Sequence, residues 1–297
     1  LTHDRTAFQA YFTDRPFEDR FAREPDEGID VIIPILHTNE LWRANLLSIY
    51  REIPVRRLLL GDGGCIDDSV EVARNFPRVE VFDHRHFKSL GFSIRRLIEE
   101  VDTEWFCYLH SDVYLPEGWF QAMCRARAKF DWFESGQNSL IMVKTVAPTL
   151  DVLRSYSGSQ MGRKIAFKSI LPTIDDDYLY RNEDIILANL IKGAGYRYGK
   201  VGETFSDHQQ IFKESPWLRR VKRVDFELEI GRDEEIRASE TYVKGIVKYL
   251  MPEQSKDLIA GLHQNVQRLI ELGALQPGEF PRWVAEVNPA WSEVFPK

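Results

Sequence analysis

Between residues 30 and 146 the chain alternates short apolar runs with amphipathic stretches, and this rhythm constrains the fold more than any other feature. The apolar runs lack the polar–apolar alternation of a half-exposed strand, as expected of strands that are covered on both faces. The stretches between them carry apolar residues at the three- and four-residue spacing of helices. A repeated strand and helix predict a mostly parallel α/β sheet flanked by helices.

The rhythm assigns strands and helices to particular residues. Strands are expected at 30–36, 56–62, 78–83, 104–110 and 139–146, and helices at 39–51, 67–75, 92–101 and 117–130. A further helix and a short strand are expected within 182–202, and C-terminal helices at 233–250 and 253–272. These elements divide the chain into an N-terminal extension at 1–28, an α/β domain at 29–213 and a helical extension at 214–297.

Composition excludes several classes of partner. The 297 residues carry a net charge of -7 with acids and bases interspersed, so the basic stripe of a nucleic-acid-binding protein is absent. Three cysteines without a CxxC spacing are expected to be reduced thiols that pack in the core. The sequence has neither an apolar run of about 18 residues nor a secretory signal at its charged start, which predicts a cytoplasmic location without a transmembrane segment.

Acidic residues and a histidine follow the predicted strands. Asp62, Asp83 and the pair His110 and Asp112 each stand where an apolar run ends. In a parallel sheet, ligands bind beyond the carboxyl ends of the strands, because the chain turns there and helix N-termini point their N–H groups inward. We therefore expect a binding site at this edge, with the polar segment 155–178 as a candidate lid.

Asp112 and His208 each have two interpretations. The carboxylate of Asp112 can hold a divalent cation at the mouth of the sheet, or it can cap the helix expected near Glu117. His208 can be a second metal ligand at the same end, or a hydrogen-bonded structural residue. One imidazole, one carboxylate and the oxygens of a diphosphate would suit manganese, and magnesium less well.

Several other charged residues also allow both a structural and a functional interpretation. Glu183 and Asp184 begin a predicted helix, where acids are favoured by the helix dipole, but Asp184 can also accept a proton from an attacking hydroxyl. Asp62 precedes two glycines that let a planar ligand approach closely, and it can instead cap the next helix. Arg96 and Lys88 are ordinary surface cations unless a diphosphate lies nearby.

These residues occur in the order of a known family. Residues from about 30 to 210 resemble the family 2 glycosyltransferases, which have the GT-A fold and use nucleotide-sugar donors. The segments that carry the resemblance are DVIIPILHTNE (30–40), LLLGDGG (58–64), KSLGFSIRR (88–96), YLHSDVYLP (108–116) and NEDIILANLIKGAGYR (182–197).

The resemblance implies a GT-A fold, to which a helical C-terminal extension is added, and it implies roles for single residues. Asp112 takes the metal-binding position of the family's Asp-x-Asp motif, and Asp184, with Glu183 beside it, takes that of the base of an inverting reaction. The contacts to the nucleotide-sugar fall on Pro34, Leu36, Asp62, Lys88, Gly91, Arg96, His110 and Ser111.

Three positions depart from the family's pattern. His110 stands where the first acid of the Asp-x-Asp motif is usual, Gly61 where the first of two acids is usual, and Ser89 where an asparagine is usual. These changes concern contacts to the nucleotide rather than the fold.

By this resemblance the protein is expected to be a Mn²⁺- or Mg²⁺-dependent inverting glycosyltransferase of the hexosyl- or N-acetylhexosaminyl-transferase class. The favoured donor is a UDP-sugar, and the acceptor is a glycan or another hydroxyl compound in polysaccharide or glycoconjugate biosynthesis. The alternative is a GT-A-fold module that binds nucleotide-sugars or glycans without catalysis. The C-terminal helices can pair with another subunit, dock on a partner domain or complete the acceptor cleft. A nucleotidyltransferase is set aside, because no glycine-rich basic loop follows the first strand.

Overall fold

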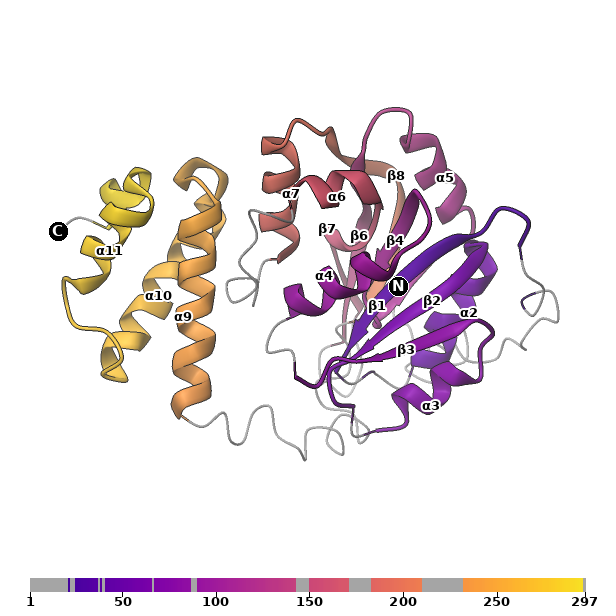
Figure 1. Ribbon diagram of the computed structural model, residues 1–297, viewed down its shortest axis with the longest axis horizontal. Helices are drawn as coiled ribbons and strands as arrows, with labels where there is room; N and C mark the ends of the chain where they lie inside the picture. Colours follow the sequence, from indigo (N-terminus) through magenta and orange to yellow (C-terminus); the bar gives the residue numbers. More distant parts are fainter. Residues whose placement is uncertain are drawn as a thin grey trace.

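The computed structural model of the chain describes residues 21, 25–36, 38, 41–65, 67–86, 90–142, 150–170, 183–209 and 232–295. In this part of the chain an eight-stranded mixed sheet has helices on both faces and is followed by a group of C-terminal helices (Figure 1). The predicted α/β class and the helical extension are confirmed. No helix among the described residues combines the length and the apolar character that a bilayer span requires.

The strands are β1 (Ile29–Ile35), β2 (Val55–Asp62), β3 (Val79–Asp83), β4 (Trp105–Leu109), β5 (Val113–Tyr114), β6 (Trp132–Met142), β7 (Leu150–Arg163) and β8 (Tyr198–Gln209). The helices are α2 (Trp42–Glu52), α3 (Ser69–Arg74), α4 (Leu90–Glu100), α5 (Trp119–Ala126), α6 (Lys164–Ile170), α7 (Glu183–Gly193), α9 (Arg232–Tyr249), α10 (Ile259–Glu271) and α11 (Glu279–Val287).

The order of the strands brings separate parts of the sequence together. Across the sheet the order is β3-β2-β1-β4-β7-β6-β8-β5. The strands β3, β2, β1 and β4 are parallel, as predicted, whereas β7 runs antiparallel to both of its neighbours. Because β6 and β8 are again parallel to β4, the carboxyl ends of β1, β2, β4, β6 and β8 share one edge.

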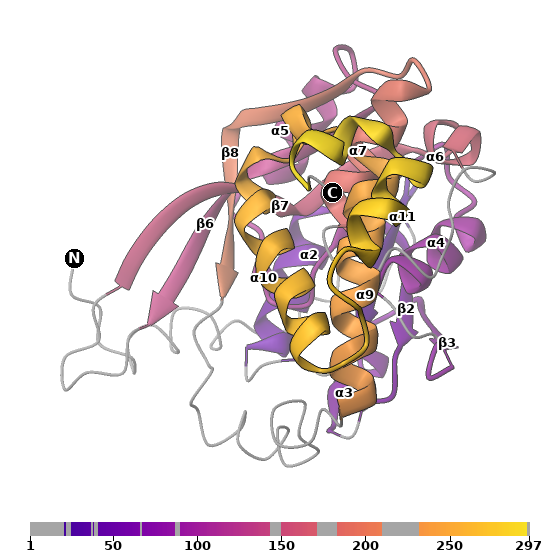
Figure 2. The same cartoon turned by 90° about the vertical axis from the view of Figure 1, so that its left-hand side faces the viewer.

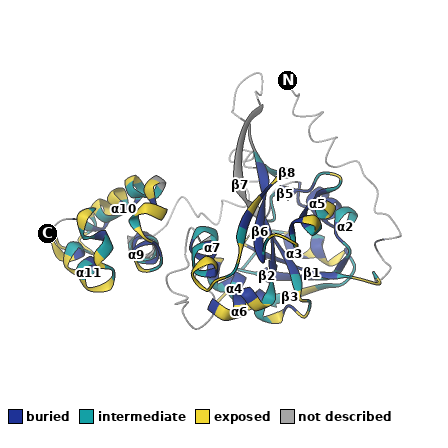
Figure 3. Cartoon of the chain, turned by 90° about the horizontal axis from the view of Figure 1, so that it is seen from above, coloured by how far each residue is buried: buried dark blue, intermediate teal, exposed yellow. Residues whose placement is uncertain are grey.

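Helices cover both faces of the sheet, which explains the unbroken apolar runs. Alternate residues of β1 point to opposite sides, with Val31 and Ile33 in the cluster under α2, α3 and α5, and Ile32 in the cluster under α4, α6 and α7. Figure 3 shows the buried residues concentrated along the sheet and the exposed ones on the outer sides of the helices. The second cluster continues into the C-terminal helices through Val243 of α9 and Leu262 of α10, which lie side by side in Figure 2.

Two sequence-based expectations are wrong in detail. The strand expected at 139–146 begins at Trp132, seven residues earlier than the pattern indicates. Its first two residues bury Trp132 and Phe133 on opposite faces, but the polar residues that follow hide the strand from an apolar-run criterion.

The candidate lid at 155–178 is also wrong where the structure describes it. Residues up to Arg163 belong to β7, and α6 follows directly. Ser159 and Gly162 fit a crowded sheet: Ser159 donates to Ser206 at 2.9 Å, and a Cβ at Gly162 would lie 2.3 Å from the Trp132 ring. Residues 171–178 lie outside the described residues.

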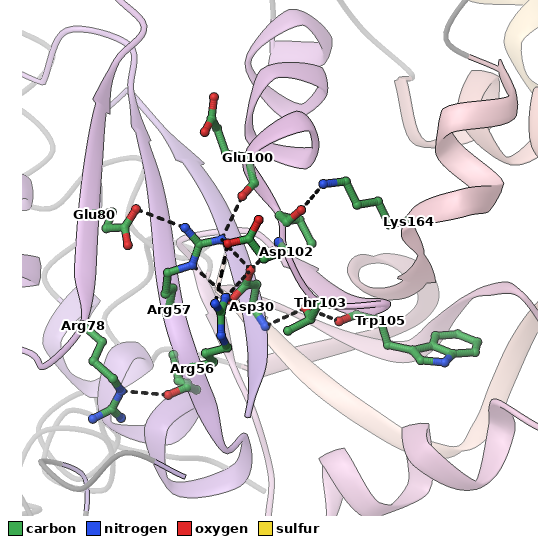
Figure 4. A network of polar contacts seen from close by, with 12 residues as sticks. Asp30, Arg56, Arg57, Arg78, Glu80, Glu100, Asp102, Thr103, Trp105 and Lys164 are labelled. Atoms are coloured by element: carbon green, nitrogen blue, oxygen red, sulfur yellow. Dashed lines mark hydrogen bonds and ion pairs between the residues drawn. The ribbon is translucent and has the colours of Figure 1, made fainter. Parts of the chain in front are cut away.

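A buried carboxylate fixes the amino edge of the central strands (Figure 4). Asp30 of β1 is fully buried and accepts hydrogen bonds from Arg56 at 3.0 Å, from Arg57 at 2.8 Å and from the backbone N–H of Asp102 at 2.8 Å. Burial opposes ionisation, but these hydrogen bonds, led by that of Arg57, hold the pKa of Asp30 below its usual value. One side chain thus ties β1 to β2 and to the turn before β4.

Replacing Asp30 with Asn is expected to lower the free energy of unfolding by about 2 to 3 kcal/mol at pH 7, because two guanidinium groups lose their shared anion. Since the pKa in the folded state lies below that in the unfolded state, the contribution of the carboxylate is complete above about pH 4. It is lost as the pH falls through the folded-state pKa. Urea unfolding at pH 7 and below pH 4 measures both quantities.

The matched control is Glu80→Gln, which removes an exposed carboxylate from the same Arg57. This substitution should lower the free energy of unfolding by less than about 1 kcal/mol. A loss in the Asp30 variant that is independent of pH, or no larger than that of Glu80→Gln, would contradict this account.

Candidate functional site

Two histidines and an aspartate converge at the carboxyl edge of the sheet. His110 and Asp112 follow β4, and His208 lies near the end of β8. The short strand β5 pairs antiparallel with β8 and sets Val113 opposite His208, so Asp112 is carried to the histidine. One potential ligand atom from each of the three side chains lies within 4.8 Å of the others.

The aspartate and one histidine form an ion pair. Nε2 of His208 lies 3.1 Å from Oδ2 of Asp112, and the two side chains are 12% and 33% exposed. Burial opposes the charged form of each group, but their mutual hydrogen bond outweighs it. The pKa of Asp112 is therefore lowered and that of His208 raised. By contrast, burial lowers the pKa of His110 and favours its neutral ring, the form that binds a metal ion.

Neighbouring side chains hold both imidazoles. The amide Nε2 of Gln137 in β6 lies 3.1 Å from Nδ1 of His208, and the Tyr108 hydroxyl lies 2.9 Å from Nε2 of His110. An amide offers both a donor and an acceptor, so Gln137 can support His208 in either tautomer. Such outer hydrogen bonds orient histidine ligands in metal sites.

The residues present fit a divalent cation. Two imidazoles and a carboxylate form a mixed nitrogen and oxygen donor set, which suits manganese and other transition ions better than magnesium. The sequence placed Asp112 and His208 in this set and assigned His110 to the nucleotide. The structure brings all three together, so His110 joins the candidate ligands.

Asp184 reaches the same region from a different element. It lies in the first turn of α7 and interacts electrostatically with His110, with Glu134 of β6 and with Tyr198 of β8. Its Oδ1 accepts a hydrogen bond from the N–H of Ile185 at 2.9 Å, so the carboxylate also satisfies an N–H group in the first turn of α7. Glu183 opens α7, but its side chain lies outside what the structure describes.

Asp62 ends β2 and organises the turn behind it. Its Oδ1 accepts from the N–H groups of Gly64 at 2.9 Å and Cys65 at 2.7 Å, so the capping interpretation holds for this oxygen. The N–H of the intervening Gly63 donates to Ile35 at the end of β1, at 2.7 Å. The half-exposed Leu36 follows, so the loops after β1 and β2 lie against each other at the carboxyl edge.

A buried histidine explains the glycine at position 61. Nδ1 of His84 lies 2.6 Å from the hydroxyl of Ser93 in α4. A Cβ on Gly61 would lie 2.6 Å from that nitrogen and 2.7 Å from that hydroxyl. Burial lowers the pKa of His84 to about 4, so the ring is neutral at pH 7. The neutral imidazole of His84 thus fills the space that a side chain at position 61 would need.

The other predicted nucleotide contacts are spread along the same edge. Pro34 is paired within β1 opposite Gly61 of β2, and the carbonyl of Ser111 accepts from Asn45 of α2 at 2.9 Å. Gly91 is buried in the first turn of α4. Lys88 lies outside the described residues.

Arg96 is engaged on the surface of α4. It pairs with Glu99 at 2.8 Å, and its guanidinium carbon lies 5.0 Å from the centre of the Phe92 ring. These contacts agree with the interpretation of Arg96 as a surface cation, and the guanidinium keeps further N–H donors for a ligand.

Sequence reasoning missed two side chains that contact the candidate metal ligands: Tyr108 and Gln137. Tyr108 was interpreted as part of an apolar strand, and Gln137 lies in the stretch of β6 that the apolar pattern did not reveal. The register of β6 against β8 brings Gln137 to His208, and a single sequence carries no signal for that register.

Comparison with known proteins places the fold. No family model matches the sequence, and no curated protein matches it. The crystal structure of S. aureus TarS 1-349 in complex with UDP-GlcNAc aligns over 90% of this chain and 79% of that one, with a TM-score of 0.50 and 14% sequence identity. This likeness shows that the chain has the GT-A fold, and the resemblance in the sequence is confirmed at that level.

Other solved structures match less of the chain. HddC from Yersinia pseudotuberculosis aligns over 61% of this chain and 93% of its own, at 12% identity and a TM-score of 0.41. The bifunctional IspDF from Campylobacter jejuni aligns over 59% of this chain, at 12% identity and a TM-score of 0.42. The present chain covers 50% of the length of IspDF.

The packing around Gly61 gives a stability prediction. Gly61→Ala should lower the free energy of unfolding by about 1 to 3 kcal/mol, because the new methyl group displaces His84 or Ser93. The cost should fall when His84 is also replaced with Ala, which denaturant unfolding of a double-mutant cycle measures. Gly193→Ala is the control, because a Cβ there meets no atom within 4 Å. Equal costs of Gly61→Ala in both backgrounds would rule out the proposed contact.

The ligand cluster predicts the pattern of metal affinity. Asp112→Asn and His208→Gln should weaken Mn²⁺ binding by more than about a hundredfold, and Gln137→Ala by about tenfold, because Gln137 only orients a ligand. Titration calorimetry measures each affinity, with His263→Gln in α10 as a histidine control that should bind like the wild type. Unchanged binding by Asp112→Asn would exclude this cluster.

Proposed function

We propose that the protein is a metal-dependent inverting glycosyltransferase that moves a sugar from a nucleotide diphosphate donor to an acceptor hydroxyl. The observation that carries the proposal is the convergence of His110, Asp112 and His208 at the carboxyl edge of a GT-A sheet. Ligands of open α/β sheets bind at this edge, and a divalent cation is the usual counterion of a diphosphate in an acidic protein.

The donor would lie along the loops after β1, β2 and β4. Leu36 and Asp62 border the nucleoside side of this edge, and the second carboxylate oxygen of Asp62 accepts neither of the two turn hydrogen bonds. Pro34, Gly91 and Ser111 would complete the nucleotide-sugar contacts, with Arg96 and Lys88 as cations for the diphosphate, whereas His110 would be a ligand of the cation. When bound, a divalent cation would neutralise the charge that develops on the leaving diphosphate.

Asp184 would act as the general base. The acceptor oxygen attacks the anomeric carbon while its proton passes to the Asp184 carboxylate. The bond between the anomeric carbon and the diphosphate oxygen breaks, and its electron pair leaves with the diphosphate. Direct displacement inverts the configuration at that carbon. Glu183 would orient the acceptor or the base, and the location of Asp184 near His110 supports a base beside the donor.

A UDP-sugar is the favoured donor, because the TarS structure of the same fold holds UDP-GlcNAc. This supports the hexosyl- or N-acetylhexosaminyl-transferase class. The mixed nitrogen and oxygen donor set separately favours Mn²⁺ over Mg²⁺. We propose residues 29–213 as the catalytic unit and 214–297 as an extension that serves an acceptor, a partner domain or a second subunit. A cytoplasmic location and a glycan acceptor belong to the same proposal.

Replacing Asp184 with Asn is expected to reduce transfer by at least about a hundredfold, because the acceptor proton loses its base. Nucleotide affinity should be kept. The measurement is turnover with Mn²⁺ over a panel of nucleotide-sugars, combined with thermal shifts. A ligand at a hundredfold its dissociation constant adds about 2.7 kcal/mol of stability to either form.

The two function classes separate in this experiment. A catalytically inactive binding module would give the same thermal shifts in both forms, but it would neither transfer nor slowly hydrolyse the donor. Full turnover by Asp184→Asn would remove this residue from the mechanism. The absence of a stability gain with any nucleotide-sugar would contradict the proposal.

A further inference from the structure

A second aspartate stands beside Asp62 at the carboxyl edge of the sheet. The parallel strands β2 and β3 lie side by side (Figure 1), and their last residues, Asp62 and Asp83, are direct partners in the register. Residues paired in this way carry their side chains on the same face of a sheet. Like charges that face each other across two strands are unfavourable, so a cation beside one of them stabilises the pair.

Arg85 supplies that cation from the loop after β3. Its Nε donates to Oδ1 of Asp83 at 2.9 Å, and its Nη2 donates to Oδ2 at 2.6 Å. This two-pronged contact fixes the plane of the guanidinium group, although the Arg85 side chain is 65% exposed. Asp83 takes two of the five N–H groups of the guanidinium, and the other three are turned away from it.

The stem of Arg85 lies against the turn that Asp62 organises. A Cβ on Gly64 would lie 3.2 Å from Cγ of Arg85 and 3.7 Å from its Cδ. The N–H of the same glycine donates to Oδ1 of Asp62 at 2.9 Å. The carboxylate of Asp62 and the side chain of Arg85 therefore border one short turn, on the side of the edge where the nucleoside would lie.

These two side chains have opposite hydrogen-bonding character. An ionised aspartate only accepts hydrogen bonds, and the second oxygen of Asp62 accepts neither of the two turn hydrogen bonds. Arginine only donates. Uracil presents an N–H donor at N3 next to a carbonyl acceptor, whereas cytosine presents a ring nitrogen acceptor next to an amino donor. An acceptor beside a donor therefore matches uracil and opposes cytosine.

We propose that Arg85, oriented by Asp83, donates a hydrogen bond to a carbonyl oxygen of the uracil ring while Asp62 accepts one from its N3–H. This inference rests on the proposed function. Arg85 is then a residue that determines the specificity for the nucleobase, and Asp83 is a positioning residue that acts through Arg85. If the ion pair only stiffened the turn, its loss would affect all nucleotides alike.

The test is titration calorimetry with three probes, UDP, CDP and pyrophosphate, each in the presence of Mn²⁺. The wild-type protein should bind UDP at least about tenfold more tightly than CDP. Arg85→Ala should weaken UDP binding by about fivefold to tenfold, because one charge-assisted hydrogen bond is lost. The affinities for CDP and for pyrophosphate should change by less than about twofold, so the preference for UDP should fall.

Two further variants separate the orientation of Arg85 from its charge. Arg85→Lys keeps a cation but cannot form the two-pronged contact, so the preference for UDP should fall nearly as far as in Arg85→Ala. Asp83→Asn keeps the arginine but removes the anion that holds it, and the preference should fall by about threefold. The ratio of the UDP and CDP affinities is compared, because it cancels any general effect of charge on the shared diphosphate.

The matched control is Arg125→Ala. Arg125 of α5 is 63% exposed and pairs with Glu203 of β8 at 3.3 Å, so its replacement also removes an exposed arginine from an ion pair. Its affinities for the three probes should stay within about twofold of those of the wild type. Equal losses of UDP and CDP binding in Arg85→Ala would indicate a structural role, and a loss of pyrophosphate binding would indicate a phosphate contact. Either result would overturn the inference.

Failure of this inference and failure of the proposed function give different results. If the wild-type protein binds no nucleotide, the proposed function fails and the inference fails with it. If it binds UDP and CDP equally, or if Arg85→Ala keeps the full preference for UDP, only the inference fails. Thermal unfolding of each variant without nucleotide should match that of the wild type, because Arg85 is mostly exposed.

Discussion

The ion pair between Asp112 and His208 joins the loop after β4 to the carboxyl end of β8. Both groups lose hydration at this edge, and their mutual hydrogen bond compensates for that loss. The contact exists because a strand of only two residues, β5, pairs with β8 and turns the chain after Asp112 toward the histidine. The remaining features of the site are arranged around this pair.

The carboxylates at the amino edge and at the carboxyl edge of the sheet are paired differently. At the amino edge a fully buried carboxylate, Asp30, is saturated by two arginines and a backbone N–H, which gives a fixed structural junction. At the carboxyl edge Asp112 is partly exposed and shares an ion pair with His208. Ionisable groups with perturbed pKa values often gather at functional sites, which agrees with the cation site that we propose at this edge.

Much of the fold could be predicted from the sequence, because apolar runs without alternation predict buried strands. The first four predicted strands agree with β1 to β4 within one or two residues, and the helix that begins at Glu183 is present. The antiparallel strand β7 could not be predicted, because Gly162 leaves room for the Trp132 ring of β6 and Ser159 donates to Ser206 of β8, so neither residue belongs to an apolar run. Such packing depends on register, which a local pattern does not contain.

The candidate site was likewise predictable from the sequence only in part. Residues that directly follow apolar runs, such as Asp62 and Asp112, were recognisable, because the ends of parallel strands meet at one edge. His110 was seen as a departure from a family motif, and its place beside His208 required the β5–β8 pairing. The glycine at 61 looked like the loss of an acid, and it proves to be the space that the buried ring of His84 fills.

We propose that two imidazoles and one carboxylate from distant parts of the chain hold the same cation. Electron spin echo spectroscopy of Mn²⁺ bound to the full chain can decide this, because the modulation reports nitrogen ligands and can be assigned with ¹⁵N-labelled histidine. We expect modulation from two histidine nitrogens, reduced to one when either His110 or His208 is replaced. Bound Mn²⁺ without histidine modulation, or modulation that survives both replacements, would contradict it.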